Sequence, residues 1–290
     1  MCIHAPATFV HPCTSHRGAE FFIIYCAFGA ANNNECFSLQ LCVSAVQSLF
    51  FLLQMNISTI PVICLDGPSG VGKGTICLAV AEHLGWHILD SGSLYRITAL
   101  QVSRLFPDSD VDSIKESQLF DIASNLSVAY EQKNNELVIL LADEDITQLI
   151  RNEQIGALAS QIAAIPVVRE ALLARQRAFL QAPGLVADGR DMGTVVFPDS
   201  ALKIYLTASP EERAQRRYKQ LKDKGIDVNL ASLVEELRLR DDRDMNRKTA
   251  PLKPASDAIV IDTTKLNIEQ VTDEVMNWVG QRVNTVRSDV

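Results

Sequence analysis

The stretch DGPSGVGKGT, residues 66–75, narrows the possible folds of this chain more than any other. It follows the apolar run VICL at 62–65 and precedes a segment whose apolar residues recur at helical spacing between 78 and 84. Gly85 stands where a glycine would end that helix. The order of strand, glycine-rich loop and helix is the local context of a phosphate-binding loop. The stretch therefore predicts a buried parallel strand whose carboxyl end faces a phosphate group.

The glycines of this stretch almost match the pattern G-x-x-x-x-G-K-[ST]. Gly67, Gly72 and Lys73 lie in register, whereas Gly74 occupies the place of the hydroxyl residue and Thr75 follows one position later. Backbone N–H groups of such a loop bind phosphate oxygens together with the N-terminus of the next helix, and the lysine adds a positive charge. A glycine-rich turn without a ligand is the alternative. The density of glycine, lysine and hydroxyl residues favours phosphate binding.

Strand-like and helix-like segments alternate after Met55. Short apolar runs predict four more strands, at 86–89, 185–187, 202–206 and 258–261. Helical spacing predicts helices at about 210–224, 230–243 and 268–283. Alternation of this kind indicates an α/β fold, in which helices wrap both sides of a five-stranded parallel sheet.

Almost a hundred residues separate the predicted second and third strands, which is too long for a simple crossover. Within them, 126–141 predicts two strands around the turn residues Asn134 and Asn135. Helices are predicted at about 147–164 and 167–181, separated by Pro166. We expect a small α+β subdomain, inserted at about 95–183, above the carboxyl ends of the strands, where open α/β sheets bind ligands.

Residues 1–54 differ in composition from the rest of the chain. They contain three charged side chains, five of the seven cysteines and three of the five histidines. These cysteines and histidines have no zinc-binding spacing, and the apolar runs at 21–31 and 39–53 are shorter than a membrane span. A secretory signal would need a basic start, which is missing. We interpret residues 1–54 as a non-native extension translated from upstream of Met55, or as a disordered one, and expect one domain at 55–290.

The charge of the chain argues against a general affinity for polyanions. Its formal net charge is −8, which attracts neither nucleic acid nor an anionic membrane. The charged residues after residue 54 have the density of a cytosolic enzyme. Cys64 and Cys77 need no disulfide there. We expect a cytoplasmic monomer without nucleic-acid or membrane partners, in which locally placed arginines bind anionic ligands.

Two polar stretches follow predicted strands. In DSGSLYR, Ser91 or Ser93 is expected to cap the next helix, and Arg96 lies about one turn along it. Capping explains the serines but not the arginine, which would face the ligand-binding cleft expected above the carboxyl ends of the strands. In ADGRDMGT, an apolar strand ends in Asp188. Acidic residues in this position often organise Mg²⁺ and its waters, although a surface turn is the alternative.

Arginines are concentrated after the predicted fourth strand, in ERAQRR at 212–217 and LRLRDDRDMNR at 237–247. A solvated charged face explains many such runs. Both runs follow a strand end, however, so that their helices can overhang the phosphate-binding loop. Phosphoryl transfer requires several cations around the transferred group, and the guanidinium group suits this because its donors form a fixed fork. The pattern favours a binding role for these arginines.

Four motifs, GPSGVGKGT, LDSGSLYR, ADGRDMGTVVFP and RDDRDMNR, resemble in this order and spacing those of the bacterial cytidylate kinases, a branch of the nucleoside monophosphate kinases. The resemblance covers essentially all of 60–280. It implies a P-loop NTPase-type fold with an inserted monophosphate-binding subdomain and a short helical lid at about 210–227. It also implies transfer of the γ-phosphoryl group of ATP to CMP or dCMP, with Mg²⁺ bound to ATP rather than directly to the protein. The late threonine is the form that this loop takes in such kinases.

The resemblance implies roles for individual residues. The ATP phosphates would be bound by the loop, which comprises Gly67, Pro68, Ser69, Gly70, Val71, Gly72, Lys73, Gly74 and Thr75. Two lid residues would close over the same phosphates, Arg213 and Arg217. The acceptor phosphate would be held by Ser91, Arg96, Arg190 and Arg247, the sugar by Arg240 and Asp244, and the cytosine by Ser160, Arg169 and Asp191, with Tyr95 also in contact. Catalysis would involve Lys73, Asp188, Arg190 and Arg247.

The residues implied for base recognition match the chemistry of cytosine. Asp191 and the Ser160 hydroxyl can accept hydrogen bonds from the exocyclic amine, and Arg169 can donate to N3. Uracil reverses both contacts and would leave buried polar groups without partners. The nearest alternative is a kinase with the same P-loop fold that phosphorylates a different acceptor, such as another monophosphate. A nucleotide-dependent switch is more distant, because the sequence lacks the guanine-reading element N-K-x-D.

Overall fold

The computed structural model describes residues 60–133, 136–223 and 225–288, so the predicted extension at 1–54 and the turn residues Asn134 and Asn135 lie outside the described part. The described residues form a five-stranded sheet in the order β2-β6-β1-β7-β8, in which all pairs are parallel. Its strands are β1 (Val62–Asp66), β2 (His87–Asp90), β6 (Leu185–Gly189), β7 (Leu202–Thr207) and β8 (Ile259–Asp262). The predicted parallel sheet is confirmed.

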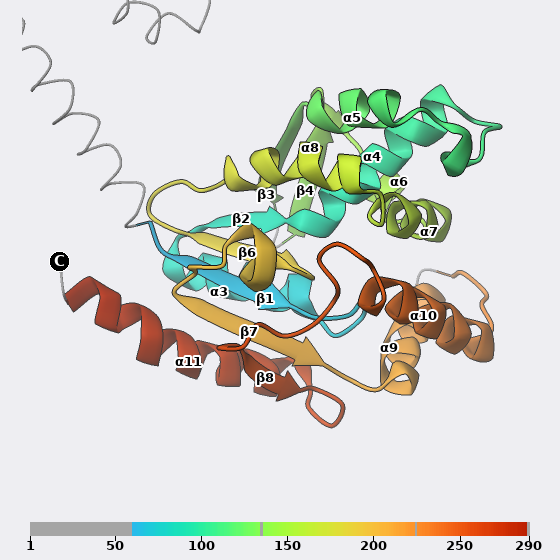
Figure 1. Ribbon diagram of the computed structural model, residues 1–290. Coiled ribbons are helices and arrows are strands. Elements are labelled where there is room, and N and C mark those ends of the chain that lie inside the picture. Colours follow the sequence, from blue (N-terminus) through green and yellow to red (C-terminus); the bar gives the residue numbers. More distant parts are fainter. Residues whose placement is uncertain (1–59, 134–135, 224, 289–290) are drawn as a thin grey trace, which may run out of the picture. The chain divides into compact units, whose positions relative to one another are not determined.

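Helices cover both faces of this sheet (Figure 1). On one face lie α3 (Lys73–Leu84) and α11 (Ile268–Ser288), and on the other α4 (Ser91–Leu105) and α8 (Pro166–Arg177). A hydrophobic core lies on each face, and residues of β1 alternate between them. Ile63 packs in the core with α3 and α11, and Cys64 packs in the core with α4 and α8. Because both faces are buried, the strands are almost uniformly apolar. Gly85 ends α3 in the left-handed conformation, with φ 66°, as the sequence predicted.

The insert between β2 and β6 combines helices with a small antiparallel sheet, β3-β4-β5. The predicted strands on either side of residues 134–135 are present as β3 (Val128–Lys133) and β4 (Glu136–Leu141). Three elements were not predicted, namely η1 (Val111–Ser113), α5 (Glu116–Ser124) and β5 (Glu144–Asp145). They are short, and α5 buries only Leu119 and Ala123, so its apolar spacing is a weak signal.

The helices after this sheet differ from the predicted ones. The single helix expected at 147–164 is wrong, because α6 (Thr147–Ile150) ends before α7 (Glu153–Ile162) begins. Asn152 separates them, since its backbone is extended and its side chain accepts a hydrogen bond from the N–H of Gln154 at 2.7 Å. Pro166 is the first residue of α8, where proline fits a helix well, and α8 ends at Arg177 rather than 181.

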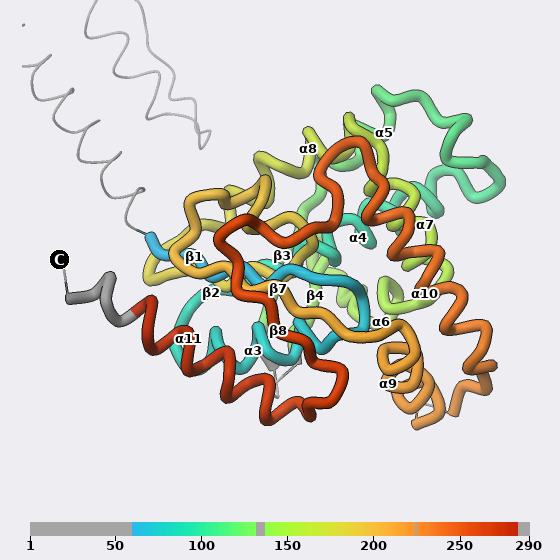
Figure 2. The backbone as a smooth tube through the Cα atoms, turned by 60° about the horizontal axis from the view of Figure 1, so that its bottom comes forward, coloured from blue at the N-terminus to red at the C-terminus, as the bar shows by residue number. Residues whose placement is uncertain are grey.

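The two arginine-rich runs lie on α9 (Pro210–Asp223) and α10 (Leu230–Met245), close to their predicted bounds. In both views α10 lies between α9 and α7 of the insert (Figures 1 and 2). This arrangement brings the arginines of α10 next to the insert and beside the carboxyl end of the sheet.

No single helix within the described ranges is long and apolar enough to cross a membrane. The helices α7 and α8 meet the criteria of length and composition only as a pair, which is bent by 101°. Buried apolar residues of both helices belong to the core on the insert side of the sheet.

Candidate active site

The predicted phosphate-binding loop connects β1 to α3. Gly67 has φ 145°, and a Cβ atom there would lie 2.1 Å from the carbonyl oxygen of Leu206 in β7. Only glycine fits this approach. Gly72 is left-handed, with φ 96°, and stands at the N-cap of α3, which no side chain of the described residues caps. The first N–H groups of α3 are therefore available to an anion.

Lys73 opens α3, and its side chain lies against the loop. Its Nζ donates to the carbonyl oxygens of Gly67 at 2.9 Å and Pro68 at 2.8 Å, and lies 3.9 Å from Asp188 Oδ1. Burial lowers the pKa of Lys73, and the Asp188 carboxylate opposes this shift. The ammonium group is thus fixed at the base of the loop.

Carboxylates gather where β1, β2 and β6 end. Asp90 and Asp188 are directly adjacent in the sheet, and Asp188 is also close to Asp66. Burial raises the pKa of Asp188 to about 7, and the neighbouring Asp90 and Asp66 add to the shift, whereas Lys73 and Arg190 oppose it. A buried acid that titrates near neutrality beside a lysine is typical of a functional site.

The prediction that Ser91 or Ser93 caps α4 is wrong. Asp90 is the N-cap, and its Oδ1 accepts a hydrogen bond from the N–H of Ser93 at 3.0 Å. The reason is that β2 ends at Asp90 and the helix begins at Ser91, so both serines already have helical backbone. Ser93 Oγ instead donates to the Asp90 carbonyl oxygen at 2.6 Å.

Asp66 holds the segment that carries Arg190 and Asp191. Its two carboxylate oxygens each accept a hydrogen bond at 2.8 Å, from the N–H groups of Met192 and Gly193. These residues open η2 (Met192–Val196), a π-helical turn. Burial raises the pKa of Asp66 to about 6 although both hydrogen bonds lower it. The stretch after β6 is therefore a buried, anchored turn and not the surface turn considered as an alternative.

A cavity of about 960 Å³ opens over the phosphate-binding loop. The loop lines it from Ser69 to Thr75, together with Asp90 and Asp188. Gly67 and Pro68, the first residues of the loop, do not line the cavity, and their carbonyl oxygens accept hydrogen bonds from Lys73. The cavity is also lined by α9 and by residues 264–268, which follow β8. This last segment was not predicted to contribute, because it has no charged motif.

A second cavity, of about 40 Å³, adjoins the first. It brings together nine of the ten residues expected to contact the acceptor nucleotide, from segments far apart in the sequence: Ser91, Tyr95, Ser160, Arg169, Arg190, Asp191, Arg240, Asp244 and Arg247. The tenth, Arg96, lines the larger cavity and donates to the Ile150 carbonyl oxygen at 2.6 Å. Gly92, Arg190 and Arg240 line both cavities, so the cavities meet at these residues.

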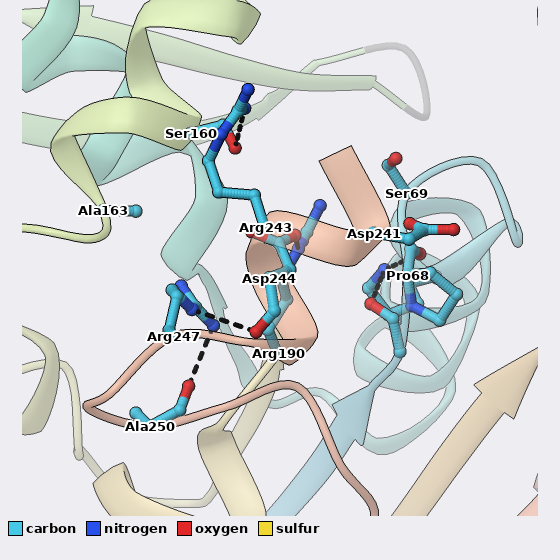
Figure 3. Close-up of polar contacts among 12 residues, drawn as sticks. Pro68, Ser69, Ser160, Ala163, Arg190, Asp241, Arg243, Asp244, Arg247 and Ala250 are labelled. Carbon is cyan, nitrogen blue, oxygen red and sulfur yellow. Dashed lines mark hydrogen bonds and ion pairs between the residues drawn. The ribbon is translucent and has the colours of Figure 1, made fainter. Parts of the chain in front are cut away.

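Pairs of arginine and carboxylate groups occupy the walls of the smaller cavity. Arg169 pairs with Asp191, and its guanidinium group lies 5.7 Å from the centre of the Tyr95 ring. Arg190 Nε donates to Asp244 Oδ2 at 2.5 Å (Figure 3). Each carboxylate satisfies a largely buried guanidinium group, so removal of either partner would leave a buried charge.

Arg240 differs from these paired arginines. Its Nε has no hydrogen-bond partner among the described residues. Burial lowers its pKa to about 9, the neighbouring Arg190 and Arg96 add to the shift, and Asp244 opposes it. A buried cation beside two others at the junction of the cavities favours binding of an anion there.

The predicted lid arginines have other partners in this structure. Arg213 is buried, pairs with Asp241 of α10 and donates to the Ser69 carbonyl oxygen at 3.1 Å, behind the loop. Arg217 pairs with Glu153 at the start of α7. The α9 cations that line the larger cavity are Arg216 and Lys219.

Comparisons with known proteins agree with this geometry. The family model "Cytidylate kinase" matches residues 63–281. The chain belongs to the cytidylate kinase family. It is 55% identical to the cytidylate kinase of Aeromonas salmonicida (strain A449) over 223 residues, which cover 77% of this chain and 95% of that protein. It is 56% identical to that of Stutzerimonas stutzeri (strain A1501) over 228 residues, 78% of this chain and 98% of that protein.

Three polar residues of this cytidylate kinase family member were not singled out in the sequence. Arg216 lines the larger cavity, Glu153 holds Arg217, and Arg243 donates to Ser160. Arg216 and Arg243 lie within the arginine-rich runs, but the sequence does not tell which arginine of a run points inward. Glu153 has no motif around it, so its contact with α9 has no sequence signal.

Proposed function

We propose that this chain transfers the γ-phosphoryl group of ATP to CMP or dCMP, giving ADP and CDP or dCDP. The observation that carries the proposal is the meeting of two unlike cavities at Gly92, Arg190 and Arg240. The larger cavity contains a phosphate-binding loop and a helix N-terminus, which suit a triphosphate. The smaller cavity has the cations and carboxylates that suit a nucleoside monophosphate.

ATP would bind with its phosphates on the loop. The backbone N–H groups of the loop from Ser69 to Thr75 would hold phosphate oxygens, and Lys73 would approach the β- and γ-phosphates. This role requires Lys73 to exchange its carbonyl contacts for phosphate oxygens. Arg213 and Arg217 belong to the lid proposed at about 210–227, and Arg217 would leave Glu153 to reach ATP when the lid closes.

Mg²⁺ would enter this site with ATP. Within the described residues, no group of three His, Cys, Asp or Glu side chains is placed to hold a metal ion. Asp188 and Asp90 end neighbouring strands and line the larger cavity, where their carboxylates can orient the water ligands of an ion held by phosphate oxygens. The ion would neutralise charge on the β- and γ-phosphates.

CMP would occupy the smaller cavity. Its phosphate would lie among Ser91, Arg96, Arg190 and Arg247, its sugar at Arg240 and Asp244, and its base at Ser160, Arg169 and Asp191. Ion pairs of Arg169 with Asp191 and of Arg190 with Asp244 close the walls of this cavity, so CMP binding would require these side chains to rearrange. The Arg169–Asp191 pair would then open so that both groups contact cytosine.

The transfer itself requires alignment and charge stabilisation more than covalent help from the protein. A phosphate oxygen of CMP attacks the γ-phosphorus, the bond to the β–γ bridging oxygen breaks, and ADP leaves with that electron pair. Lys73, Arg190 and Arg247 would stabilise the charge on the transferred group. Asp188, or alternatively Asp191, would accept a proton from a protonated CMP phosphate. Closure of the insert and lid would exclude water, which otherwise hydrolyses ATP.

We also propose one kinase domain at 55–290, which acts on free nucleotides as a cytoplasmic monomer. The insert would comprise about 95–183. Cys64 and Cys77 are buried and form no disulfide with another described residue, which is compatible with a reducing compartment. Gel filtration with light scattering tests the monomer, and a stable dimer would contradict it.

An ADP-release assay tests the activity. The purified protein is given MgATP with CMP, dCMP, UMP, AMP or dTMP, and kcat/KM is measured for each acceptor. We expect CMP and dCMP to exceed the other acceptors by at least about 100-fold, because a mismatched base leaves buried polar groups without partners. Equal activity with UMP or AMP would favour another acceptor. ATP binding without phosphorylation of any monophosphate would favour a nucleotide-dependent switch.

A further inference from the structure

One hydrogen bond connects the base-recognition part of the candidate site to α10. Arg243 Nη1 donates to Ser160 Oγ at 2.9 Å, and Figure 3 shows the long side chain extending from α10 to α7. Ser160 is only 3% exposed, whereas Arg243 is an exposed residue. The guanidinium group therefore reaches a buried hydroxyl group from the outside of the site.

Arg243 lies on α10 close to two residues of the candidate site, Arg240 and Asp244. It follows Arg240 by three positions and directly precedes Asp244, and residues three and four positions apart share one face of a helix. Arg240 and Asp244 line the smaller cavity, and Arg243 does not. Its link to the cavity is Ser160, which does line it.

The hydroxyl group of Ser160 can form hydrogen bonds with Arg243 and with cytosine at the same time. A serine hydroxyl accepts two hydrogen bonds and donates one. Arg243 uses one acceptor position, and the other can still accept from the amine of cytosine. The bond to Arg243 also holds α7, which carries the base contact, at a set distance from α10, which carries the proposed sugar contacts.

We propose that Arg243 is a positioning residue for nucleobase selection, which acts through Ser160 and aligns base recognition on α7 with sugar and phosphate binding on α10. The inference rests on the proposed function, because it assigns a role within the CMP site. It makes Arg243 a determinant of affinity and selectivity for the acceptor, and not of ATP binding.

A double-mutant cycle tests this role. Arg243→Met, Ser160→Ala and the double variant are compared with the wild-type protein by ADP release with CMP and with UMP. We expect Arg243→Met to raise KM for CMP by about 10-fold, the effect of one charge-assisted hydrogen bond, with kcat and KM for ATP within about 2-fold of wild type. The ratio of kcat/KM for CMP to that for UMP should fall. In the Ser160→Ala background, Arg243→Met should change KM for CMP by less than about 2-fold.

Two further variants separate this role from general effects of charge. Arg238→Met removes another arginine of α10, whose exposed side chain pairs with Glu211, and should leave every constant unchanged. Arg243→Lys keeps a donor of the same charge and should restore part of the affinity for CMP. Equal melting temperatures of the variants show that they are folded; a variant that is not folded is replaced by Arg243→Gln.

The outcomes distinguish this proposal from the proposed function. An unchanged KM for CMP in Arg243→Met, or an equal change with and without Ser160, would overturn the role of Arg243 while wild-type activity with CMP upheld the function. A loss in Arg238→Met as large as in Arg243→Met would also overturn it. If wild-type protein phosphorylated UMP or AMP as well as CMP, the proposed function itself would fail.

Discussion

The two cavities of the candidate site offer different groups to a ligand, backbone N–H groups in one and paired side chains in the other. The larger, at about 960 Å³, offers phosphate groups the backbone of a single loop and one lysine, whereas the smaller, at about 40 Å³, is walled by side chains from distant segments. Backbone N–H groups tolerate many side chains, provided that glycine stands at positions such as Gly67. Paired side chains do not, because loss of one partner leaves the other buried and charged. Substitutions should therefore act locally and differently in the two cavities.

The largest effect is expected from the one side-chain charge of the loop. Lys73→Met should lower kcat by about 100- to 1000-fold, because a preorganised cation at the transferred phosphate is lost. Binding of CMP, measured by calorimetry without ATP, should stay within about 2-fold of wild type. Lys222→Met, at an exposed lysine beside Tyr218, serves as the control and should be fully active. A comparable loss of CMP binding in Lys73→Met would show that the cavities are not independent.

A smaller effect is expected in the acceptor cavity from Asp191→Ala. It leaves the guanidinium group of Arg169, 10% exposed, without its carboxylate, and removes a proposed acceptor for the cytosine amine. We expect kcat/KM for CMP to fall by about 100-fold and KM for ATP to change by less than about 3-fold, in steady-state assays. Asp199→Ala, at an exposed position of the same segment, should have no effect. Equal losses for both nucleotides would contradict the separation of the sites.

The pH dependence probes Asp188, a carboxylate that lines the larger cavity. The pKa of Asp188 is raised from 3.8 to about 7, so the group is protonated below neutrality and ionised above it. Because the ionised form is the one that assists MgATP and accepts a proton, kcat/KM for ATP should rise about 10-fold from pH 6 to pH 8. Asp188→Asn should be less active and lose this inflection, leaving the ionisations of Asp66 and of the nucleotides. An unchanged inflection in Asp188→Asn would exclude Asp188 as its source.

The smallest effect is expected at the contact between lid and insert. Glu153→Gln weakens the pair with Arg217, in which both side chains are at least 30% exposed. An exposed pair contributes little, so KM for ATP should fall by only about 2- to 3-fold as Arg217 becomes free to approach ATP. Glu144→Gln, which disrupts the exposed pair with Arg104 elsewhere in the insert, is the matched control. A rise in KM for ATP would indicate that the pair instead stabilises the closed lid.

The sheet and the phosphate-binding loop of the larger cavity could be predicted because each is marked by consecutive residues in the sequence. Apolar runs mark the buried strands, and nine neighbouring residues contain the glycines and the lysine of the loop. The helix cap at Asp90 was missed because serine and aspartate cap helices equally well, and only the end of β2 decides between them. The break at Asn152 was missed because apolar residues at helical spacing occur on both sides of it, at 146–150 and 155–162.

The smaller cavity could not be derived from spacing, because its walls come from α4, α7, α8, the turn before η2, and α10. The resemblance supplied its residues, and the structure places nine of them around one space. The directions of individual arginines depend on tertiary partners. Arg213 is drawn behind the loop by Asp241, and Arg243 reaches Ser160 on another helix. No local pattern distinguishes these arginines from their neighbours in the same runs.

The most direct test of two adjoining cavities is a crystal structure of the protein with CMP and a non-hydrolysable ATP analogue. We expect the triphosphate on residues 67–75, the cytosine at Ser160 and Asp191, and the CMP phosphate beside Arg190 and Arg247, in line with the γ-phosphate. CMP bound outside the smaller cavity, or with its phosphate turned away from Arg190 and Arg247, would contradict the proposed site.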